Sequence, residues 1–256
     1  MNLFVTIVIG AIIGVSSGMF GIGGALLATP LLNVWLLLPA KLALATPLPA
    51  AIPSSISGSI AYARNRLVRY QVGLRAVMVA MPMTVVGSYL TKVTPDAVLM
   101  VATGLTLLFV SWTFLRRGLR KDSELEALEA LPERTFGTQA YLACAVAGFM
   151  SGFLAIGGGM VLVPTFVKIL RLPMKSALAT SLFCVALLAL PGVVVHGMLE
   201  HIDWNVALIL SISVIPMSYL GARIATRLRN VTLERIYGGV MMLFAIYFIT
   251  MHLLNP

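Results

Sequence analysis

The sequence predicts an all-α polytopic membrane protein built from two repeats of opposite orientation. Three observations lead to this fold class. The 256 residues are 59% hydrophobic and only 11% charged, with a mean hydropathy of +0.99. The chain divides into ten apolar segments, and its second half repeats the first. This composition excludes an ordinary soluble enzyme, in which about 25% of residues are charged, and a disordered protein.

The ten apolar segments are bounded by Gly, Pro or charged residues. They lie at about 3–19, 25–38, 42–62, 72–91, 97–115, 139–154, 159–170, 176–198, 204–222 and 232–253. Most approach the roughly 20 residues that a helix needs to cross a bilayer core. Two are short, about 21 and 18 Å at the helical rise, and each follows a glycine cluster. We therefore expect 8–10 transmembrane helices, with the glycine-rich pairs either spanning fully or forming re-entrant hairpins. No Lys or Arg precedes the first segment, so we interpret it as a membrane helix, not a removable signal peptide.

Basic residues predict the sidedness of the chain. If the N-terminus is outside and each segment returns the chain to the other face, sixteen of the eighteen Lys and Arg residues fall on cytoplasmic loops. Only Lys41 and Lys92 fall outside. Cytoplasmic loops carry an excess of Lys and Arg, so the sequence predicts a cell (inner) membrane protein with both termini outside. The net charge of +9 then reports topology, and we expect no nucleic-acid partner.

An offset of 134 residues superposes the two halves without a gap. Matched positions include Gly14 and Gly148, Pro30 and Pro164, Lys41 and Lys175, and the run Ala-Leu-Ala-Thr at 43–46 and 177–180. Five segments per half is an odd number, so the copies lie in opposite orientation. We divide the chain into repeat 1 (1–115), a cytoplasmic linker (116–138) and repeat 2 (139–256). Within the linker, Ser123 and Glu126 form a capping box ahead of a short helix.

Two glycine clusters are the sharpest candidates for a binding site. They comprise Gly21, Gly23 and Gly24 in the first half, and Gly157, Gly158 and Gly159 in the second. Such clusters either let helices pack closely or break a helix so that its N–H groups face a cavity. Each cluster here precedes a short segment at matching positions in the two halves, which is typical of transporter sites. Free N–H groups at a helix N-terminus bind anions.

Hydroxyl side chains are the second group of candidates. Thr46 and Thr180 occupy matching positions, with Ser54 nearby in one copy and Ser181 in the other. These hydroxyls could bind the oxygen atoms of an anion, or they could cap backbone groups and bond a neighbouring helix. Pro47, Pro49 and Pro53 interrupt the first copy.

The sequence lacks the residue patterns that several kinds of chemistry require. All nine acidic residues lie in loops or at segment ends, so we expect no buried carboxylate for a proton relay or a cation site. Cys144 and Cys184 give neither a disulfide framework nor a metal-ligand spacing. There is no nucleophile–base pair and no phosphate-binding loop. We therefore expect no enzyme activity, no metal and no cofactor, and any proton coupling would come from the substrate or from His196 or His201.

The glycine motifs GMFGIGGALLATPLL at 18–32 and GFLAIGGGMVLVPTFV at 152–167 resemble those of the TauE/SafE family of sulfite exporters and sulfonate permeases. The repeated Lys-x-Ala-Leu-Ala-Thr at 41–46 and 175–180 adds to the resemblance, which covers nearly the whole chain. It implies secondary transport of sulfite or of a small organosulfur anion, in either direction.

The leading hypothesis is a secondary transporter that moves a small anion by alternating access around a site between the repeats. Its partners are then the anionic substrate and the lipid bilayer. Two alternatives remain open: a passive channel for a small solute, and a membrane scaffold or assembly protein in which the glycines serve packing alone.

Overall fold

A computed structural model describes residues 3–118 and 132–254, and the regular structure in these ranges is helical. The helices are α1 (Leu3–Phe20), α2 (Ala25–Trp35), α3 (Ala40–Ala45), α4 (Leu48–Ala63), α5 (Tyr70–Val93), α6 (Asp96–Gly118), α8 (Thr138–Phe153), α9 (Gly159–Lys168), α10 (Met174–Met198), α11 (Trp204–Arg227) and α12 (Asn230–Leu254). The predicted capping box of Ser123 and Glu126 lies outside the described residues. The assignment of 116–138 as a cytoplasmic linker therefore stays a prediction.

Five of these helices are long and apolar enough to cross a bilayer: α1, α5, α10, α11 and residues 96–116 of α6. Their outward side chains are large and apolar; Phe4 is 75% exposed and Phe109 is 71% exposed. In water such surfaces would be costly, whereas lipid accommodates them. The chain is therefore a multi-pass membrane protein, as the composition predicted.

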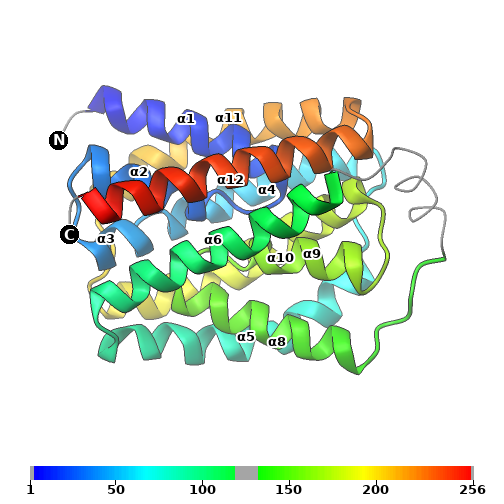
Figure 1. The fold of residues 1–256 in the computed structure, drawn as a ribbon, viewed down its shortest axis with the longest axis horizontal. Helices are drawn as coiled ribbons and strands as arrows, with labels where there is room; N and C mark the ends of the chain where they lie inside the picture. Colours follow the sequence, from blue (N-terminus) through cyan, green and yellow to red (C-terminus); the bar gives the residue numbers. More distant parts are fainter. Residues whose placement is uncertain (1–2, 119–131, 255–256) are drawn as a thin grey trace.

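The helices run between the two ends of an elongated bundle (Figure 1). Both described ends of the chain, at α1 and α12, lie at the same end of the bundle, together with the α2–α3, α5–α6 and α10–α11 connections. We call this the terminal end. The α4–α5, α9–α10 and α11–α12 connections lie at the other end, which we call the basic end. Arg64, Arg66, Arg171 and Arg229 belong to the connections there.

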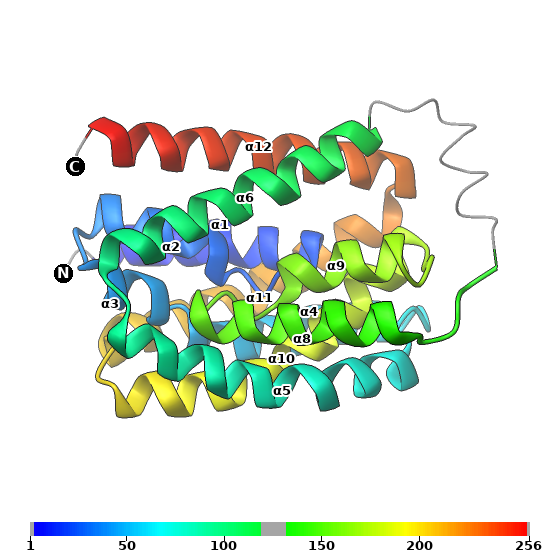
Figure 2. The same ribbon diagram turned by 60° about the horizontal axis from the view of Figure 1, so that its bottom comes forward.

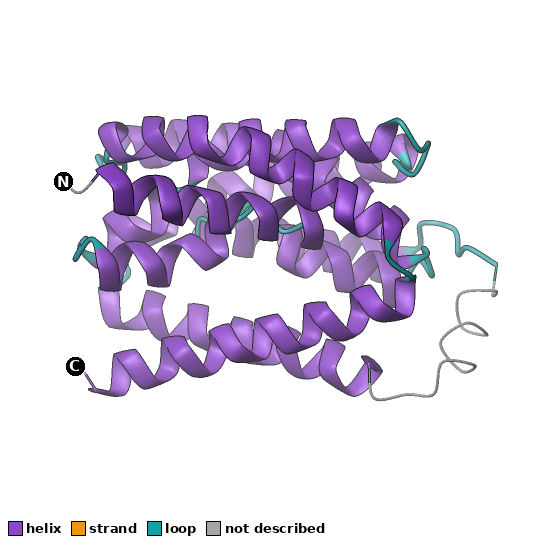
Figure 3. Ribbon diagram, turned by 90° about the horizontal axis from the view of Figure 1, so that it is seen from above, coloured by secondary structure: helices purple, strands orange, loops and turns teal. Residues whose placement is uncertain are grey.

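Two helix pairs enter the bundle from opposite ends. The α1–α2 pair starts at the terminal end and the α8–α9 pair starts at the basic end (Figure 2). Figure 3 shows loop segments in the interior of the bundle, away from both ends. Each pair thus turns back inside the protein, which agrees with the hairpin alternative and not with two full spans. Non-helical backbone at membrane depth is tolerated where protein surrounds it.

Glycine allows the pairs to approach long helices closely. A β-carbon on Gly18 of α1 would lie 1.9 Å from the Ser218 carbonyl oxygen of α11, and one on Gly152 of α8 would lie 1.9 Å from the Thr84 carbonyl oxygen of α5. Such distances are impossible for any residue with a side chain, so the α1–α11 and α5–α8 contacts require glycine. These four residues match in pairs at the 134-residue offset.

The bounds of α5 and α11 also match at this offset, whereas one segment differs between the halves. The segment predicted at 42–62 is divided into α3 and α4 by a turn at Thr46 and Pro47, while its counterpart α10 is continuous. Pro47 has no N–H to donate and clashes with a preceding helical turn. Ser181 stands at the matching position in α10 and imposes neither constraint.

Candidate functional site

The two glycine loops share one backbone conformation. Gly21, Gly23 and Gly24 have φ of 69°, 75° and 81°, and the matching residues of the second loop have similar values of 48° to 76°. This left-handed region is open to glycine at little cost but strains other residues. Ala155, which matches Gly21, adopts it with φ of 48°. The sequence therefore breaks both helices in the same way.

The two loops meet at the centre of the protein. A β-carbon on Gly159 would lie 2.5 Å from the Gly21 carbonyl oxygen, so the start of α9 touches the first loop. Both loops also contact Val185 of α10: its Cγ1 lies 2.5 Å from a β-carbon position on Gly23 and 2.9 Å from one on Gly157. We call this meeting point the glycine junction. It brings together all six glycines selected from the sequence.

Two helix N-termini with unpaired amides lie at this junction. Both α2 and α9 begin here, and Gly24 and Gly158 are their N-cap residues. Among the described residues, the N–H groups of Gly23, Gly24, Gly157 and Gly158 have no hydrogen-bond acceptor. The first N–H groups of a helix carry a partial positive charge and are a ready site for an anion. Two such ends converge, one from each half of the chain.

Two serine hydroxyls complete the junction. Ser181 of α10 donates a hydrogen bond to the Gly21 carbonyl oxygen at 2.8 Å and lies 3.4 Å from the Gly159 carbonyl oxygen, so it links the two loops. Ser55 of α4 is fully buried, and its Oγ has no hydrogen-bond partner. That Oγ lies 3.5 Å from a β-carbon position on Gly23. A buried hydroxyl without a partner is costly, and a bound oxyanion would satisfy it.

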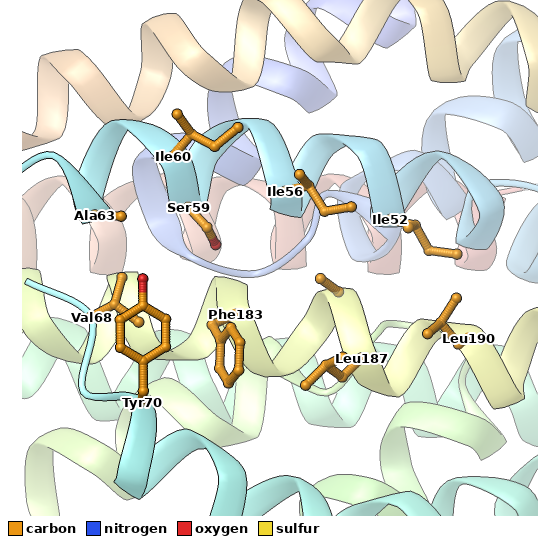
Figure 4. Close-up of a pocket in the computed structure, with 11 residues that line it drawn as sticks. Ile52, Ile56, Ser59, Ile60, Ala63, Val68, Tyr70, Phe183, Leu187 and Leu190 are labelled. Atoms are coloured by element: carbon orange, nitrogen blue, oxygen red, sulfur yellow. The ribbon is translucent and has the colours of Figure 1, made fainter.

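A groove lies on the same helix, α4, that carries Ser55. It lies between α4 and α10, has a volume of about 340 Å³ and is lined mainly by apolar side chains such as Ile56 and Leu187. Figure 4 shows the Ser59 hydroxyl directed into it, with the Tyr70 ring on the opposite side. Ser59 Oγ is also buried without a partner. Because Ser59 and Ser55 are four residues apart on α4, their hydroxyls lie on one face of the helix; Ser59 lines the groove, and Ser55 lies beside the first glycine loop.

A second cavity of about 380 Å³ lies between α4 and α11. Pro49, Pro53 and Trp204 line it, and at the 134-residue offset they match Phe183, Leu187 and Tyr70 of the groove. Tyr70 begins α5 at the basic end, whereas Trp204 begins α11 at the terminal end. Two related cavities therefore each include the first residue of a long helix, and these two helix starts lie at opposite ends of the bundle.

Thr46 and Thr180 lie away from the junction and have matched roles in the backbone. Thr46 Oγ1 accepts a hydrogen bond from the amide of Asp203, the N-cap of α11, at 3.0 Å. Thr180 Oγ1 accepts one from the amide of Arg69, the N-cap of α5, also at 3.0 Å. These contacts agree with the capping alternative considered for the hydroxyls. Both side chains are fully buried.

Ser54 also lies in a helix contact. Its hydroxyl donates to Ser17 Oγ at 2.8 Å, and its carbonyl oxygen accepts from Ser218 at 2.7 Å. It thereby joins α4 to α1 and α11. Of the four hydroxyl residues selected from the sequence, the structure brings only Ser181 to the glycine junction.

One expectation about charge is wrong. Glu234 does lie near the start of α12, as a segment-end residue, but it is only 1% exposed. Burial comes from packing: α12 lies against α6, and the neighbouring Tyr237 side chain is fully enclosed. The described residues therefore include a buried carboxylate. They contain no group of three or more His, Cys, Asp or Glu residues that could hold a metal ion.

The site residues selected from the sequence included neither Ser55, which is one of the hydroxyls near Thr46, nor Ser59. The signal was present, because two hydroxyls four residues apart in an apolar segment share one helix face. The neighbouring Ser54 and Ser57 concealed it, since four serines within six residues give no clear periodicity.

Comparison with known proteins shows that this chain is similar, over nearly its whole length, to proteins named as membrane transporters. A family profile described as "Sulfite exporter TauE/SafE" matches residues 6–248. The chain is 26% identical to the "Probable membrane transporter protein YunE" of Bacillus subtilis, covering 95% of this chain and 96% of the relative. It is 28% identical to a "Probable membrane transporter protein" of Xylella fastidiosa (97% and 95% covered) and 25% identical to one of Methanocaldococcus jannaschii (93% of each). No solved structure matches the chain.

Proposed function

Because this chain belongs to the TauE/SafE family of membrane transporters, we propose that it carries a small oxyanion across the cell membrane and binds it at the glycine junction. The substrate is sulfite or an organosulfonate. The observation that carries this proposal is the convergence of two helix N-termini with unpaired amides beside the unpartnered hydroxyl of Ser55.

Anion binding fits the chemistry of the junction. Its donors are backbone N–H groups and serine hydroxyls, which bind the oxygens of sulfite and of a sulfonate equally well. Among the residues that the structure describes, no Lys or Arg contributes to it, so the partial charges of the helix ends supply the electrostatic attraction. Such a site favours a weakly held, exchangeable anion over a tightly bound one, as transport requires. The proposed donors to the anion are the amides of Gly23, Gly24, Gly157 and Gly158 and the hydroxyl of Ser55. Gly21, Gly159 and Ser181 hold the two loops together, while Thr46, Thr180 and Ser54 position the helices around them.

Transport proceeds by alternating access between two inverted-topology repeats. The matched helix bounds, the opposite entry of the α1–α2 and α8–α9 pairs and the paired threonine contacts all support this arrangement. In this proposal the two related cavities would extend to the junction in turn as the repeats move. The basic end faces the cytoplasm, in accord with the positive-inside rule, and both termini are outside.

Uptake into liposomes tests the function. The purified protein is reconstituted, and uptake of radiolabelled sulfite is measured against competing sulfonate, sulfate, phosphate and chloride. We expect saturable uptake that a sulfonate or unlabelled sulfite blocks and that chloride leaves unchanged. Non-saturable flux would favour a passive channel. Absence of flux for every anion, from protein whose fold is verified by thermal unfolding, would overturn the proposal and favour a scaffold.

A further inference from the structure

The side chain of His196 contacts the backbone of α8 just before the second glycine loop. His196 lies in the last turn of α10 and is fully buried. Its Nε2 is 3.0 Å from the carbonyl oxygen of Gly152 on α8, three residues before the helix break begins at Ala155. A carbonyl oxygen only accepts hydrogen bonds, so Nε2 carries the proton.

The matching contact in the first half uses a tyrosine. Tyr62 matches His196, and Gly18 matches Gly152, at the 134-residue offset. The Tyr62 hydroxyl donates to the Gly18 carbonyl oxygen at 3.1 Å. In both halves, therefore, a side chain near the end of α4 or α10 donates a hydrogen bond to the carbonyl oxygen that precedes the glycine loop. We call this hydrogen bond the latch. Only in the second latch is the donor an imidazole, which titrates near neutral pH.

A second histidine connects this latch to the terminal end. His201, in the α10–α11 connection, lies with its Nδ1 3.3 Å from Nδ1 of His196. Since the Nε2 of a neutral His196 is the donor, its Nδ1 is an acceptor, and His201 Nδ1 donates to it. The chain of donors runs inward, from His201 to His196 to Gly152. In the first half Leu67 matches His201 and offers no such connection.

We propose that His196 and His201 form a proton-binding site on the terminal face that controls the second glycine loop, and so makes anion transport depend on protons. This proposal rests on the proposed transport function. A proton binds at Nε2 of His201, which becomes an imidazolium, while the fully buried His196 stays neutral because burial disfavours a charged ring. The charged His201 then donates a stronger hydrogen bond from its Nδ1 to Nδ1 of His196, and this polarises the Nε2–H of His196 toward the Gly152 carbonyl oxygen. The protonated latch therefore restrains the end of α8.

The groups around the pair set the pH at which it responds. Burial lowers the pKa of His201 from 6.5; the Lys41 ammonium of α3 lowers it further, and the Asp96 carboxylate of α6 opposes this. Nζ of Lys41 and Oδ1 of Asp96 are 3.6 Å apart and form an ion pair. Asp203 accepts hydrogen bonds from two amides of α11, and Glu200 is exposed. The pair is therefore neutral at pH 7 and takes up its proton below about pH 6.5.

Sulfonate flux across a pH series tests the consequence, because the charge of a sulfonate is constant over this range. We expect wild-type flux to fall by at least about fivefold, the lower end of typical coupling between sites, as the pH on the terminal face drops from 7.5 to 5.5. His196→Tyr, which installs the latch of the first half, should transport with no such pH dependence. Tyr62→Phe is the matched control: it removes the other latch and should keep the pH dependence. An unchanged pH profile in His196→Tyr would overturn the proposal.

Nitrogen NMR of 15N-histidine protein in liposomes gives a readout without transport. The chain has three histidines, and His252→Gln removes the third. At pH 7.5 we expect His196 as the Nε2–H tautomer and His201 as the Nδ1–H tautomer, with uptake of one proton by His201 below pH 6.5. In His201→Leu the His196 ring should stay neutral over the same range. Independent titration of the two rings, or the opposite tautomers, would contradict the site even if transport is absent, so failure of the transport function remains distinguishable.

Discussion

At the scale of single residues, the unpartnered hydroxyl of Ser55 is the clearest mark of a ligand. Ser181 and Ser54 satisfy their hydroxyls within the protein, whereas Ser55 and Ser59 do not, although both Oγ atoms are buried. Leaving a buried polar atom unsatisfied costs about 1–3 kcal/mol. Such a cost at the glycine junction is explained if an anion accepts a hydrogen bond from Ser55 during part of the transport cycle.

We therefore predict that Ser55→Ala weakens anion binding about five- to tenfold, the effect of one lost hydrogen bond, without lowering thermal stability. Sulfite binding to the purified variant, measured by calorimetry, and a thermal unfolding curve check both parts. The control is Ser57→Ala, two residues away, where the hydroxyl donates to the Ile215 carbonyl oxygen on the protein surface. Equal affinities for wild type and Ser55→Ala would remove Ser55 from the site.

The glycine loops could be located from the sequence, whereas the positions of most hydroxyls could not, for a physical reason. Positive φ is a local property that glycine reveals in the sequence, so the loops could be found from Gly23, Gly24 and Gly157. The partner of a threonine is a tertiary property. Nothing near Thr46 in the sequence indicates that its hydroxyl receives the amide of Asp203, 157 residues away.

At the scale of helices, each of the two threonines anchors the start of a long helix in the other half: Thr180 anchors α5, and Thr46 anchors α11. Arg69 and Asp203 are N-cap residues whose amides need acceptors, and Thr180 and Thr46 supply them. Each half thus fixes a long helix of its counterpart. The apolar segments and their Gly, Pro and charged boundaries predicted the positions of the helices, and the prolines at 47, 49 and 53 indicated the interruption that the structure places at Pro47. The pairing of α1 with α11 and of α5 with α8 could not be predicted, because apolar faces in a membrane protein do not indicate their partners.

Removal of either threonine hydroxyl should reduce stability by a similar amount. We predict that Thr46→Val and Thr180→Val each destabilise the protein by about 1 kcal/mol, since each leaves a backbone amide without its acceptor. Chemical unfolding in detergent measures this. Thr106→Val is the control, because the Thr106 hydroxyl donates only to the carbonyl four residues earlier in α6. If Thr106→Val destabilises as much as the other two, the loss is a general effect of the substitution and the anchoring role is wrong.

At the scale of the whole molecule, the charge bias and the two ends of the bundle describe the same sidedness. The connections at the basic end carry Arg and Lys, while Lys41 and Lys92 lie toward the terminal end, as the sequence predicted. The sequence left open whether the glycine-rich pairs span fully or form hairpins, and the turns inside the bundle favour hairpins. The orientation in a membrane stays a prediction, since only the charge rule supports it.

Labelling of α5 tests this orientation directly. Gln71 is exposed in its first turn, and Lys92 is exposed in its last turn, about 32 Å away at the helical rise. The native Cys144 and Cys184 are buried, so they should not react. On intact cells we expect a membrane-impermeant maleimide to label Lys92→Cys and to label Gln71→Cys only after permeabilisation. The reverse pattern would place the basic end outside.

The central claim is that the glycine junction binds the transported anion, and sulfite binding to a Gly157→Ala variant tests it most directly. Gly157 has φ of 72°, and an added β-carbon would lie 2.9 Å from Val185 Cγ1 and beside the unpaired amides. Gly239→Ala in α12, where a β-carbon meets nothing within 4 Å, is the control. We predict wild-type affinity for Gly239→Ala and, for folded Gly157→Ala, a loss of at least about tenfold, or 1.4 kcal/mol. Unchanged affinity in Gly157→Ala would show that the anion binds elsewhere.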